Sequence, residues 1–337
     1  MRTDEIGHRM IITGGLGQSG VSTLNAALTA HPEIATCPLE TCFVVTGGGL
    51  LNVTDAISDD FSPMRVDDAL ARFDRLMRHD LCSPRSYPFN RIDLTSIFGK
   101  GTYRNAIDQY FSEIGAERYR GDGLTIEPRI RVGDWALPGK AKRFHLPWWV
   151  GRERDYLYTM PRRSRQQAVL AGRHLIESLH GARAERLGRA VWTDQTTNNL
   201  LDADFWAELF PEALFVQVVR DPLDVAITQQ RQVWGPDDFQ QVCSSIRDSF
   251  ERWRQVQGCI PGDAYVEVRF EDLIRSPAAV VQTVARSAGI GDGPANLDLK
   301  LDWSRLDSSS EARSRVNLDI YRTILGPVAH CLGYAVP

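Results

Sequence analysis

Most of the chain alternates short apolar runs with longer segments in which apolar residues recur every three or four positions. Residues 10–13 form an apolar run that stops at two glycines, and residues 21–30 then suit a helix that ends before a His-Pro pair. This order of strand, glycine loop and helix is the context that a phosphate-binding loop requires. A further apolar run at 42–45 follows Glu40 and predicts a second strand.

The alternation resumes after Gln166. The predicted helices cover 166–188, 202–210, 237–258 and 276–290, and the predicted strands cover 189–196, 213–222 and 264–273. Asp202 or Asp204 is a candidate N-cap, and Ser276 with Pro277 is expected to open the last of these helices. Strands that alternate with helices predict an α/β fold, in which helices cover both faces of a parallel central sheet.

Residues 47–165 differ from the rest, because they are richer in Gly, Pro, Asp and Arg and show weak periodicity. One helix is predicted at 67–81, where Leu70, Phe73 and Leu76 share a face. Residues 140–165 mix aromatic with basic side chains. We interpret 47–165 as an insertion that forms a lid over a site, within a single domain that spans 1–337.

Composition and charge narrow the class of protein. The 337 residues are 43% hydrophobic and 24% charged, as in ordinary globular domains, and a net charge of −4 argues against a nucleic-acid binder. The sequence shows neither the apolar stretch of a signal peptide nor a segment as long as a membrane span. Six cysteines without a C-x-x-C pair favour buried thiols in a reducing compartment. We therefore expect a cytoplasmic protein, and the excess of arginine over lysine is typical of a high-GC bacterium.

The loop after the first predicted strand, "GGLGQSGVSTL", has the glycines of a phosphate loop without its lysine. In the pattern G-x-x-x-x-G-K-[ST], Val21 takes the lysine position. Glycines let successive amides turn toward one point, and a helix N-terminus favours an anion. Ser19, Ser22 and Thr23 would add hydroxyl donors. The alternative is a plain strand-to-helix turn.

A second polar group follows the buried strand at 213–222, whose end carries Arg220 and Asp221. Ligands of open α/β sheets lie at this edge, and a guanidinium presents a planar fork of donors to a phosphate. Thr228 lies eight residues beyond Arg220, about two helical turns on, where its hydroxyl can bind the same group. The alternative is that Arg220 pairs with Asp221 or Asp224 as a structural ion pair.

These segments resemble the motifs of sulfotransferases. The stretch "GLGQSGVSTLNAALTAHPEI" is similar to their 5′-phosphosulfate loop G-x-x-R-S-G-T-T-L-L with its following H-P-x-I, and "VVRDPLDVAITQQR" is similar to their 3′-phosphate motif V-R-D-P-x-D-V-x-x-S. "WTDQTTNNL" falls where many members have W-x-x-K-T-P, and "RFEDLIRSPAAVVQTVARSAGI" and "CLGY" also resemble family segments. The resemblance implies a phosphate-loop NTPase-like three-layer fold with a mostly helical or irregular insertion.

The resemblance also implies a chemistry. The donor would be 3′-phosphoadenosine 5′-phosphosulfate, the product adenosine 3′,5′-bisphosphate, and no metal would be needed. The 3′-phosphate would be held by Arg220 and Thr228, and the 5′-phosphosulfate by Gly17, Gln18, Ser19, Gly20, Val21, Ser22 and Thr23. The acceptor would be a hydroxyl or amine of a small molecule or glycoside.

The insertion would recognise this acceptor, as such regions do in the family. Its aromatic residues are candidate acceptor contacts or core residues, namely Trp148, Trp149, Tyr156 and Tyr158. We expect neither nucleic acid nor a membrane as a partner. The helix at 237–257 is a candidate homodimer contact.

Glu40 is the candidate general base, because it follows the first helix closely and should lie near the open side of the loop. A similar Glu is the base in tyrosylprotein sulfotransferases, and burial beside the donor would raise its pKa toward a useful range. The alternative is that Glu40 caps a helix or pairs with an arginine of the insertion. His145, in the basic and aromatic segment, is the rival base.

Two positions depart from the family pattern, and both lose a cation. Gln18 stands where the loop usually has Arg or Lys, and Gln195 stands at the lysine of W-x-x-K-T-P. Neutral donors make hydrogen bonds about half as strong as charged ones. We expect insertion arginines to fold over the donor and supply the charge, and the candidates are Arg143, Arg152, Arg154, Arg162, Arg163 and Arg165.

The same two departures leave other functions open. One is a different donor on the same fold, and another is a phosphate-loop kinase or NTPase, against which Val21 counts. A third is a scaffold that keeps the pocket without catalysis.

Overall fold

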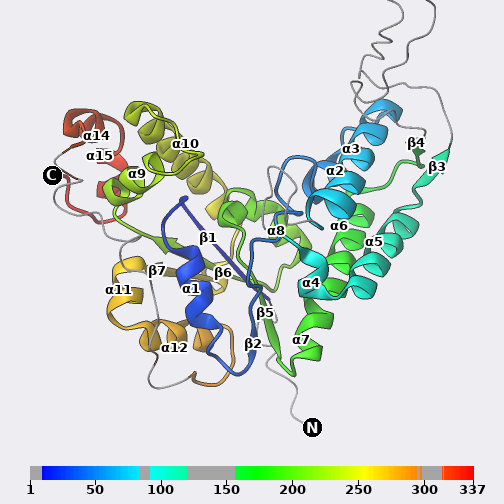
Figure 1. Cartoon of the computed structure of the whole chain (residues 1–337), viewed down its shortest axis with the longest axis horizontal. Helices are drawn as coiled ribbons and strands as arrows, with labels where there is room; N and C mark the ends of the chain where they lie inside the picture. The colour runs from blue at the N-terminus through cyan, green and yellow to red at the C-terminus, as the bar shows by residue number, and fades with distance from the viewer. Residues whose placement is uncertain (1–9, 83–91, 120–155, 294–296, 298–312, 314) are drawn as a thin grey trace, which may run out of the picture.

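A five-stranded parallel sheet forms the centre of the molecule (Figure 1). The computed structural model describes residues 10–82, 92–119, 156–293, 297, 313 and 315–337. In spatial order the strands are β2 (Ile34–Ala35), β5 (Val191–Asp194), β1 (Met10–Gly15), β6 (Leu214–Val219) and β7 (Tyr265–Arg269). Every neighbouring pair is parallel, and Ile12 of β1 pairs with Asp194 on one side and Phe215 on the other. The predicted α/β fold with a parallel central sheet is confirmed.

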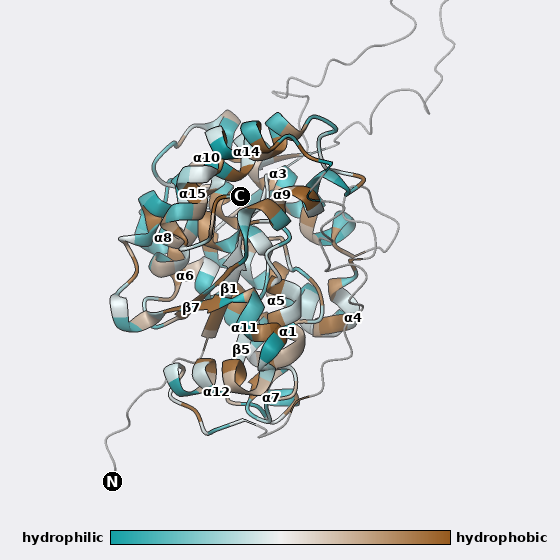
Figure 2. Cartoon of the chain, turned by 90° about the vertical axis from the view of Figure 1, so that its left-hand side faces the viewer, coloured by the Kyte–Doolittle hydropathy of each residue, from teal (hydrophilic) through white to brown (hydrophobic). Residues whose placement is uncertain are grey.

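Side chains of β1 alternate between two hydrophobic layers, as the period of a strand requires. Ile11 belongs to a cluster with Leu24 and Val281. These come from the helices of one face, α1 (Val21–Leu28) and α12 (Pro277–Ser287), which lie beside α11 (Phe270–Arg275) in Figure 1. Met10 and Ile12 belong to a larger cluster on the opposite face. In Figure 2 the strand β1 is mainly hydrophobic, while the surrounding helices mix both colours.

The chain between β2 and β5 contributes helices that share the larger hydrophobic cluster with β1. The helices are α2 (Leu50–Ile57), α3 (Pro63–Arg75), α4 (Leu94–Phe98), α5 (Lys100–Ile114), α6 (Arg165–Ile176) and α7 (Ala182–Arg186). π-helical turns extend α3 at Leu76–Asp80 and join α6 to α7 at Glu177–Gly181. The strands β3 (Glu117–Tyr119) and β4 (Leu157–Thr159) pair with each other as a two-stranded antiparallel ribbon. Leu70, Phe73 and Leu76 are all buried, so the predicted apolar face is confirmed.

The remaining helices follow β5; among the last of them, α14 packs against α10 and α15 packs against α14. They are the 3₁₀ helix η4 (Thr197–Asp202), α8 (Ala203–Leu209), α9 (Pro222–Gln230), α10 (Phe239–Gln257), the 3₁₀ turn η5 (Gly262–Ala264), α14 (Leu318–Ile324) and α15 (Gly326–Cys331). Asp202 precedes α8 and Ser276 precedes α12, but neither side chain caps its helix. Pro277 does open α12.

The predicted strand at 42–45 is wrong. Residues 41–49 form successive turns, in which the amide of Thr46 donates to the carbonyl of Cys42 at 3.1 Å. The strand forms earlier, at Ile34–Ala35, where it pairs with Val191 and Trp192. Phe43 is fully buried within the turns, so the apolar run reflects core packing without a strand.

The cysteines are all free thiols, and only half of them are buried. The buried thiols are Cys37, Cys42 and Cys243, whereas Cys259 and Cys331 are exposed.

Candidate functional site

The carboxyl ends of the parallel strands bring four polar segments to one edge of the sheet. These are the glycine loop after β1, residues 195–197 after β5, residues 220–221 after β6, and residues 270–271 after β7. In open α/β sheets this edge is where ligands bind.

The glycine loop bends sharply before α1. Its backbone is left-handed at Gln18 (φ 68°) and at Gly20 (φ 106°). A Cβ on Gly20 would also lie 2.3 Å from a ring carbon of Phe270. Both the left-handed backbone and this steric clash therefore disfavour a side chain at position 20. The first helical bond of α1 joins the amide of Leu24 to the carbonyl of Gly20 at 3.0 Å. The amides of residues 21–23 therefore lie at the first turn, where a helix offers them no acceptor.

Two side chains from outside the loop hold its carbonyl groups. The Nη1 of Arg220 donates to the carbonyl of Gln18 at 3.1 Å, and the Nε2 of Gln229 donates to the carbonyl of Gly17 at 2.8 Å. The C=O and N–H of one trans peptide point in opposite directions. The bond from Gln229 therefore turns the amide of Gln18 away from α9. Sequence reasoning missed Gln229, although it directly follows Thr228 within the segment that carries Arg220.

The guanidinium of Arg220 lies under the loop, with the whole side chain only 3% exposed. Its carbon centre stands 4.7 Å above the ring centroid of Phe270, within the range of a cation–π contact. Burial lowers the pKa of Arg220, and the nearby charges of Asp224, Glu271 and Asp221 act against that shift. A positive charge is therefore set at the glycine loop by the residue that follows β6.

Arg313 forms ion pairs with Asp221 and Asp224, the two residues that the sequence offered as ion-pair partners of Arg220. Its Nη2 lies 3.1 Å from Asp221 and 2.5 Å from Asp224. Thr228 is nearly buried on α9, and its hydroxyl donates to the carbonyl of Asp224 at 2.6 Å. A role of Thr228 toward a phosphate stays a prediction.

The hydroxyl-bearing residues of the loop differ in exposure. Ser22 is exposed, whereas Thr23 and Val21 are buried. Ser19 is 1% exposed, and its hydroxyl has no hydrogen-bond partner within the described residues. A buried hydroxyl of this kind is a donor still available to a group at the loop.

Glu40 is half-buried and is held by a residue that sequence reasoning missed. The hydroxyl of Thr197 donates to the Oε1 of Glu40 at 2.6 Å. Burial raises the pKa of Glu40, the charge of Asp194 raises it further, and the bond from Thr197 lowers it. The carbonyl of Thr197 would lie 3.2 Å from a Cβ placed on Gly14, so η4 connects Glu40 to the end of β1.

Gln195 does not extend toward the glycine loop as a substitute for lysine. Its side chain is 4% exposed, and its Nε2 donates to the carbonyl of Cys37 at 2.8 Å. The side-chain amide of Gln195, at the position where the family has a lysine, is therefore bonded within the core. Gln18 is half-buried in the loop, and its carbonyl is the group that Arg220 contacts.

The predicted insertion arginines within the described residues have other partners. Arg162 donates to the carbonyl of Ser58, Arg163 donates to the carbonyl of Ile114, and Arg165 pairs with Asp55, Asp59 and Glu208. These three do not fold over the loop, so this part of the expectation is wrong. Six other predicted residues lie outside the described residues, namely His145, Arg143, Arg152, Arg154, Trp148 and Trp149. Tyr158 is buried in the core, and Tyr156 lies 3.4 Å from the guanidinium of Arg118.

A polar hollow with a volume of about 690 Å³ lies along α10 beside η4. Its lining includes Leu201, Gln241, Ser245, Asp248 and Arg252. The opposite face of α10 is apolar and buried. Leu201 and Thr197 are four residues apart in η4, or about 8 Å along a 3₁₀ helix.

The part of the chain that the structure describes holds neither a metal-binding cluster nor a membrane-spanning helix. No three His, Cys, Asp or Glu side chains there gather closely enough to hold a metal ion. None of the helices in the same ranges has the length and apolar character needed to cross a bilayer.

The sequence profile of the sulfotransferase family matches residues 120–292, which include β5, β6 and β7. Among solved structures, the sulfotransferase domain of the Synechococcus PCC 7002 olefin synthase is 15% identical, with 100% of this chain and 99% of that chain covered at a TM-score of 0.45. Sulfotransferase STF1 from Mycobacterium tuberculosis H37Rv is 14% identical, with 96% and 76% covered at a TM-score of 0.42. A sulfotransferase from Alicyclobacillus acidocaldarius is 11% identical, with 97% and 96% covered at a TM-score of 0.39. No curated protein sequence matches the chain.

Proposed function

Because the chain belongs to the sulfotransferase family, we propose that it transfers a sulfuryl group from 3′-phosphoadenosine 5′-phosphosulfate to a hydroxyl or amine. The observation that carries the proposal is the bond from Arg220 to the carbonyl of Gln18. It puts a fixed cation at a loop that lacks one of its own. Sulfuryl transfer, like phosphoryl transfer, depends on positioning and on charge stabilisation more than on covalent chemistry.

The glycine loop is proposed to hold the 5′-phosphosulfate, and Arg220 with Thr228 the 3′-phosphate. The first-turn amides of α1 and the buried hydroxyl of Ser19 are donors suited to an anion. Val21, the first residue of α1, is 3% exposed and packs in the hydrophobic core. It occupies the position where a phosphate-loop kinase needs its lysine. That burial favours sulfuryl transfer over a kinase.

In the proposed reaction the acceptor oxygen attacks sulfur, and the bond from sulfur to the 5′-phosphate oxygen breaks. The electron pair of that bond leaves with adenosine 3′,5′-bisphosphate, and the acceptor proton passes to the carboxylate of Glu40. Its raised pKa suits this role, because a base works best when its pKa lies near the operating pH. Loop amides would stabilise the charge that develops on the leaving phosphate.

The proposed acceptor is a small polar molecule, such as a glycoside. The hollow along α10 supports this class, since serine hydroxyls and glutamine amides line it. The 3₁₀ helix η4 joins this hollow to Thr197, which contacts the proposed base.

A transfer assay tests the proposal. The protein would be incubated with radiolabelled donor, EDTA, and a panel of phenols, aliphatic alcohols and glycosides. We expect label in at least one acceptor, and we expect Glu40→Gln to lose that transfer while it binds adenosine 3′,5′-bisphosphate normally. The matched control is Glu33→Gln, whose carboxylate contacts the amide of Gly291. Normal turnover in Glu40→Gln would move the base elsewhere.

A further inference from the structure

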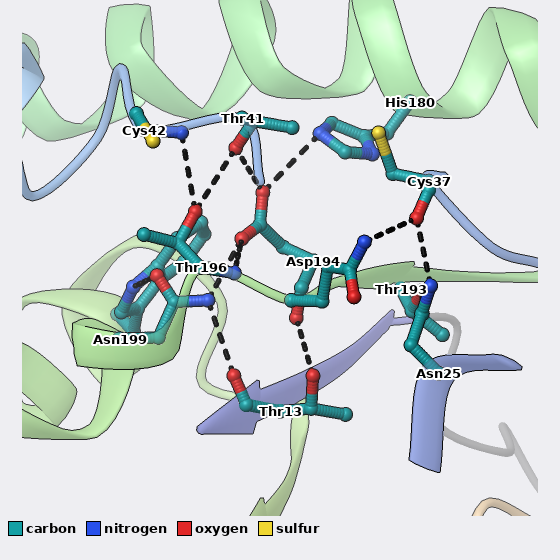
Figure 3. Close-up of polar contacts among 12 residues, drawn as sticks. Thr13, Asn25, Cys37, Thr41, Cys42, His180, Thr193, Asp194, Thr196 and Asn199 are labelled. Carbon is teal, nitrogen blue, oxygen red and sulfur yellow. Dashed lines mark hydrogen bonds and ion pairs between the residues drawn. The ribbon is translucent and has the colours of Figure 1, made fainter. Parts of the chain in front are cut away.

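A buried polar network links the segment of Glu40 to the segment of Thr197 (Figure 3). Its centre is the carboxylate of Asp194, the last residue of β5, which is fully buried. One oxygen accepts from the hydroxyl of Thr41 at 2.5 Å. The other accepts from the amide of Thr196 at 3.0 Å and from the side-chain amide of Asn199 at 2.7 Å.

The two threonines in this network are the chain neighbours of the two residues that meet at the proposed base. Thr41 follows Glu40, and Thr196 precedes Thr197. The two segments are also joined directly, because the amide of Cys42 donates to the hydroxyl oxygen of Thr196 at 3.1 Å. Cys42 has a left-handed backbone (φ 61°), a conformation that a non-glycine residue keeps only where its surroundings hold it.

His180 lies against the same carboxylate without supplying a charge. Its Nε2 is 3.5 Å from Asp194, and its ring stacks on Trp192 with centroids 4.6 Å apart. Burial lowers the pKa of His180 to about 4, so the ring is neutral near pH 7. The carboxylate of Asp194 is therefore met by hydroxyl and amide donors, and it can fix two chain segments at once.

We propose that Asp194 is a positioning residue, which acts through Thr41 and Thr196 to hold Glu40 against Thr197. The inference rests on the proposed function, since it gives Glu40 the role of the base. Glu40 faces two further titratable groups, the carboxylate of Asp194 and the thiol of Cys42. Removing the charge of Asp194 would itself lower the pKa of Glu40, so the test uses Thr41 instead.

The test is an NMR titration of the Glu40 carboxyl in protein with isotope-labelled glutamate, with the signal assigned from Glu40→Gln. Thr41→Val removes one bond to Asp194, and Thr41→Ser restores the hydroxyl. The matched control is Thr193→Val on the same strand, which loses a buried bond of 2.9 Å to Asn25 and leaves the network of Asp194 in place. We expect the midpoint of Glu40 to move in Thr41→Val and to stay at the wild-type value in the other two.

Turnover and binding give a second readout. With any acceptor found in the transfer screen, we expect Thr41→Val to lower kcat by about tenfold to a hundredfold, as a small misplacement of a reacting group does, with nucleotide affinity unchanged. If Thr41→Val does not fold, Thr196→Val breaks the bond to Cys42 and should move the same midpoint.

The proposal is overturned if folded Thr41→Val or Thr196→Val titrates like the wild type, or if Thr193→Val moves the midpoint equally. The titration needs no donor. Failure to bind adenosine 3′,5′-bisphosphate would therefore refute the proposed function and leave this test standing.

Discussion

Replacing Arg220 with alanine removes the cation that the residue after β6 places at the glycine loop. The variant loses the bond to the carbonyl of Gln18 at 3.1 Å and the contact of the guanidinium with the ring of Phe270 at 4.7 Å. It also leaves the carboxylates of Asp224 and Glu271 with less compensating charge.

The size of the effect follows from these contacts. A hydrogen bond to a charged group contributes about 1.5–3 kcal/mol, and each 1.4 kcal/mol is about tenfold in Kd. We therefore expect Arg220→Ala to weaken the binding of adenosine 3′,5′-bisphosphate by about tenfold to a hundredfold. The lost cation–π contact should also lower the free energy of unfolding by about 0.5–2 kcal/mol.

The assay is isothermal titration calorimetry, with the folded state of each variant checked by thermal unfolding. Arg220→Lys is the charge-preserving control, and we expect an intermediate affinity because an ammonium lacks the planar fork of donors. Gln229→Ala removes a neutral bond to the same loop and should cost less than Arg220→Ala. A folded Arg220→Ala protein with wild-type affinity would refute this reasoning and remove Arg220 from the site.

Three further predictions follow from the loop, the base and the thiols. Gly20→Ala should lower the free energy of unfolding by about 2–4 kcal/mol in denaturant titrations, whereas Gly47→Ala, with no atom near the added Cβ, should cost less than about 0.5 kcal/mol. Since the pKa of Glu40 is raised in the fold, activity should rise as the pH passes through that raised value, and a flat pH–rate profile would argue against its role as base. The contribution of Glu40 to the free energy of unfolding should fall as the pH rises from the ordinary pKa of a glutamate to the raised value. A thiol reagent should modify Cys259 and Cys331 rapidly, while the three buried thiols, whose pKa burial raises to about 12, should react only on unfolding.

Local sequence patterns predicted strands of the sheet where the spacing of apolar residues matches the side chains that the strand buries. The strand at 214–219 is apolar at every position but Gln217, and it is buried throughout. The run at 42–45 failed because its burial comes from turns that pack into the core, and an apolar run alone cannot distinguish the two.

The candidate site was predicted where one segment carries the information, and it was missed where the contact joins distant segments. The loop and Arg220 lie within motifs, but the contact of Thr197 with Glu40 spans 157 residues, and no local pattern reports it. Gln195 was assigned to the site by its place in a motif, yet its side chain turns toward Cys37. Thr197 offered only a weak signal, a hydroxyl three residues after the end of β5.

The most direct test of the account is the nucleotide that the wild-type protein binds, measured by calorimetry in EDTA and again with Mg²⁺. We predict that adenosine 3′,5′-bisphosphate binds in EDTA, that adenosine 5′-monophosphate binds more weakly because it lacks the 3′-phosphate, and that Mg²⁺ leaves both affinities unchanged. Binding of ATP that requires Mg²⁺, with no binding of the 3′,5′-bisphosphate, would contradict the account.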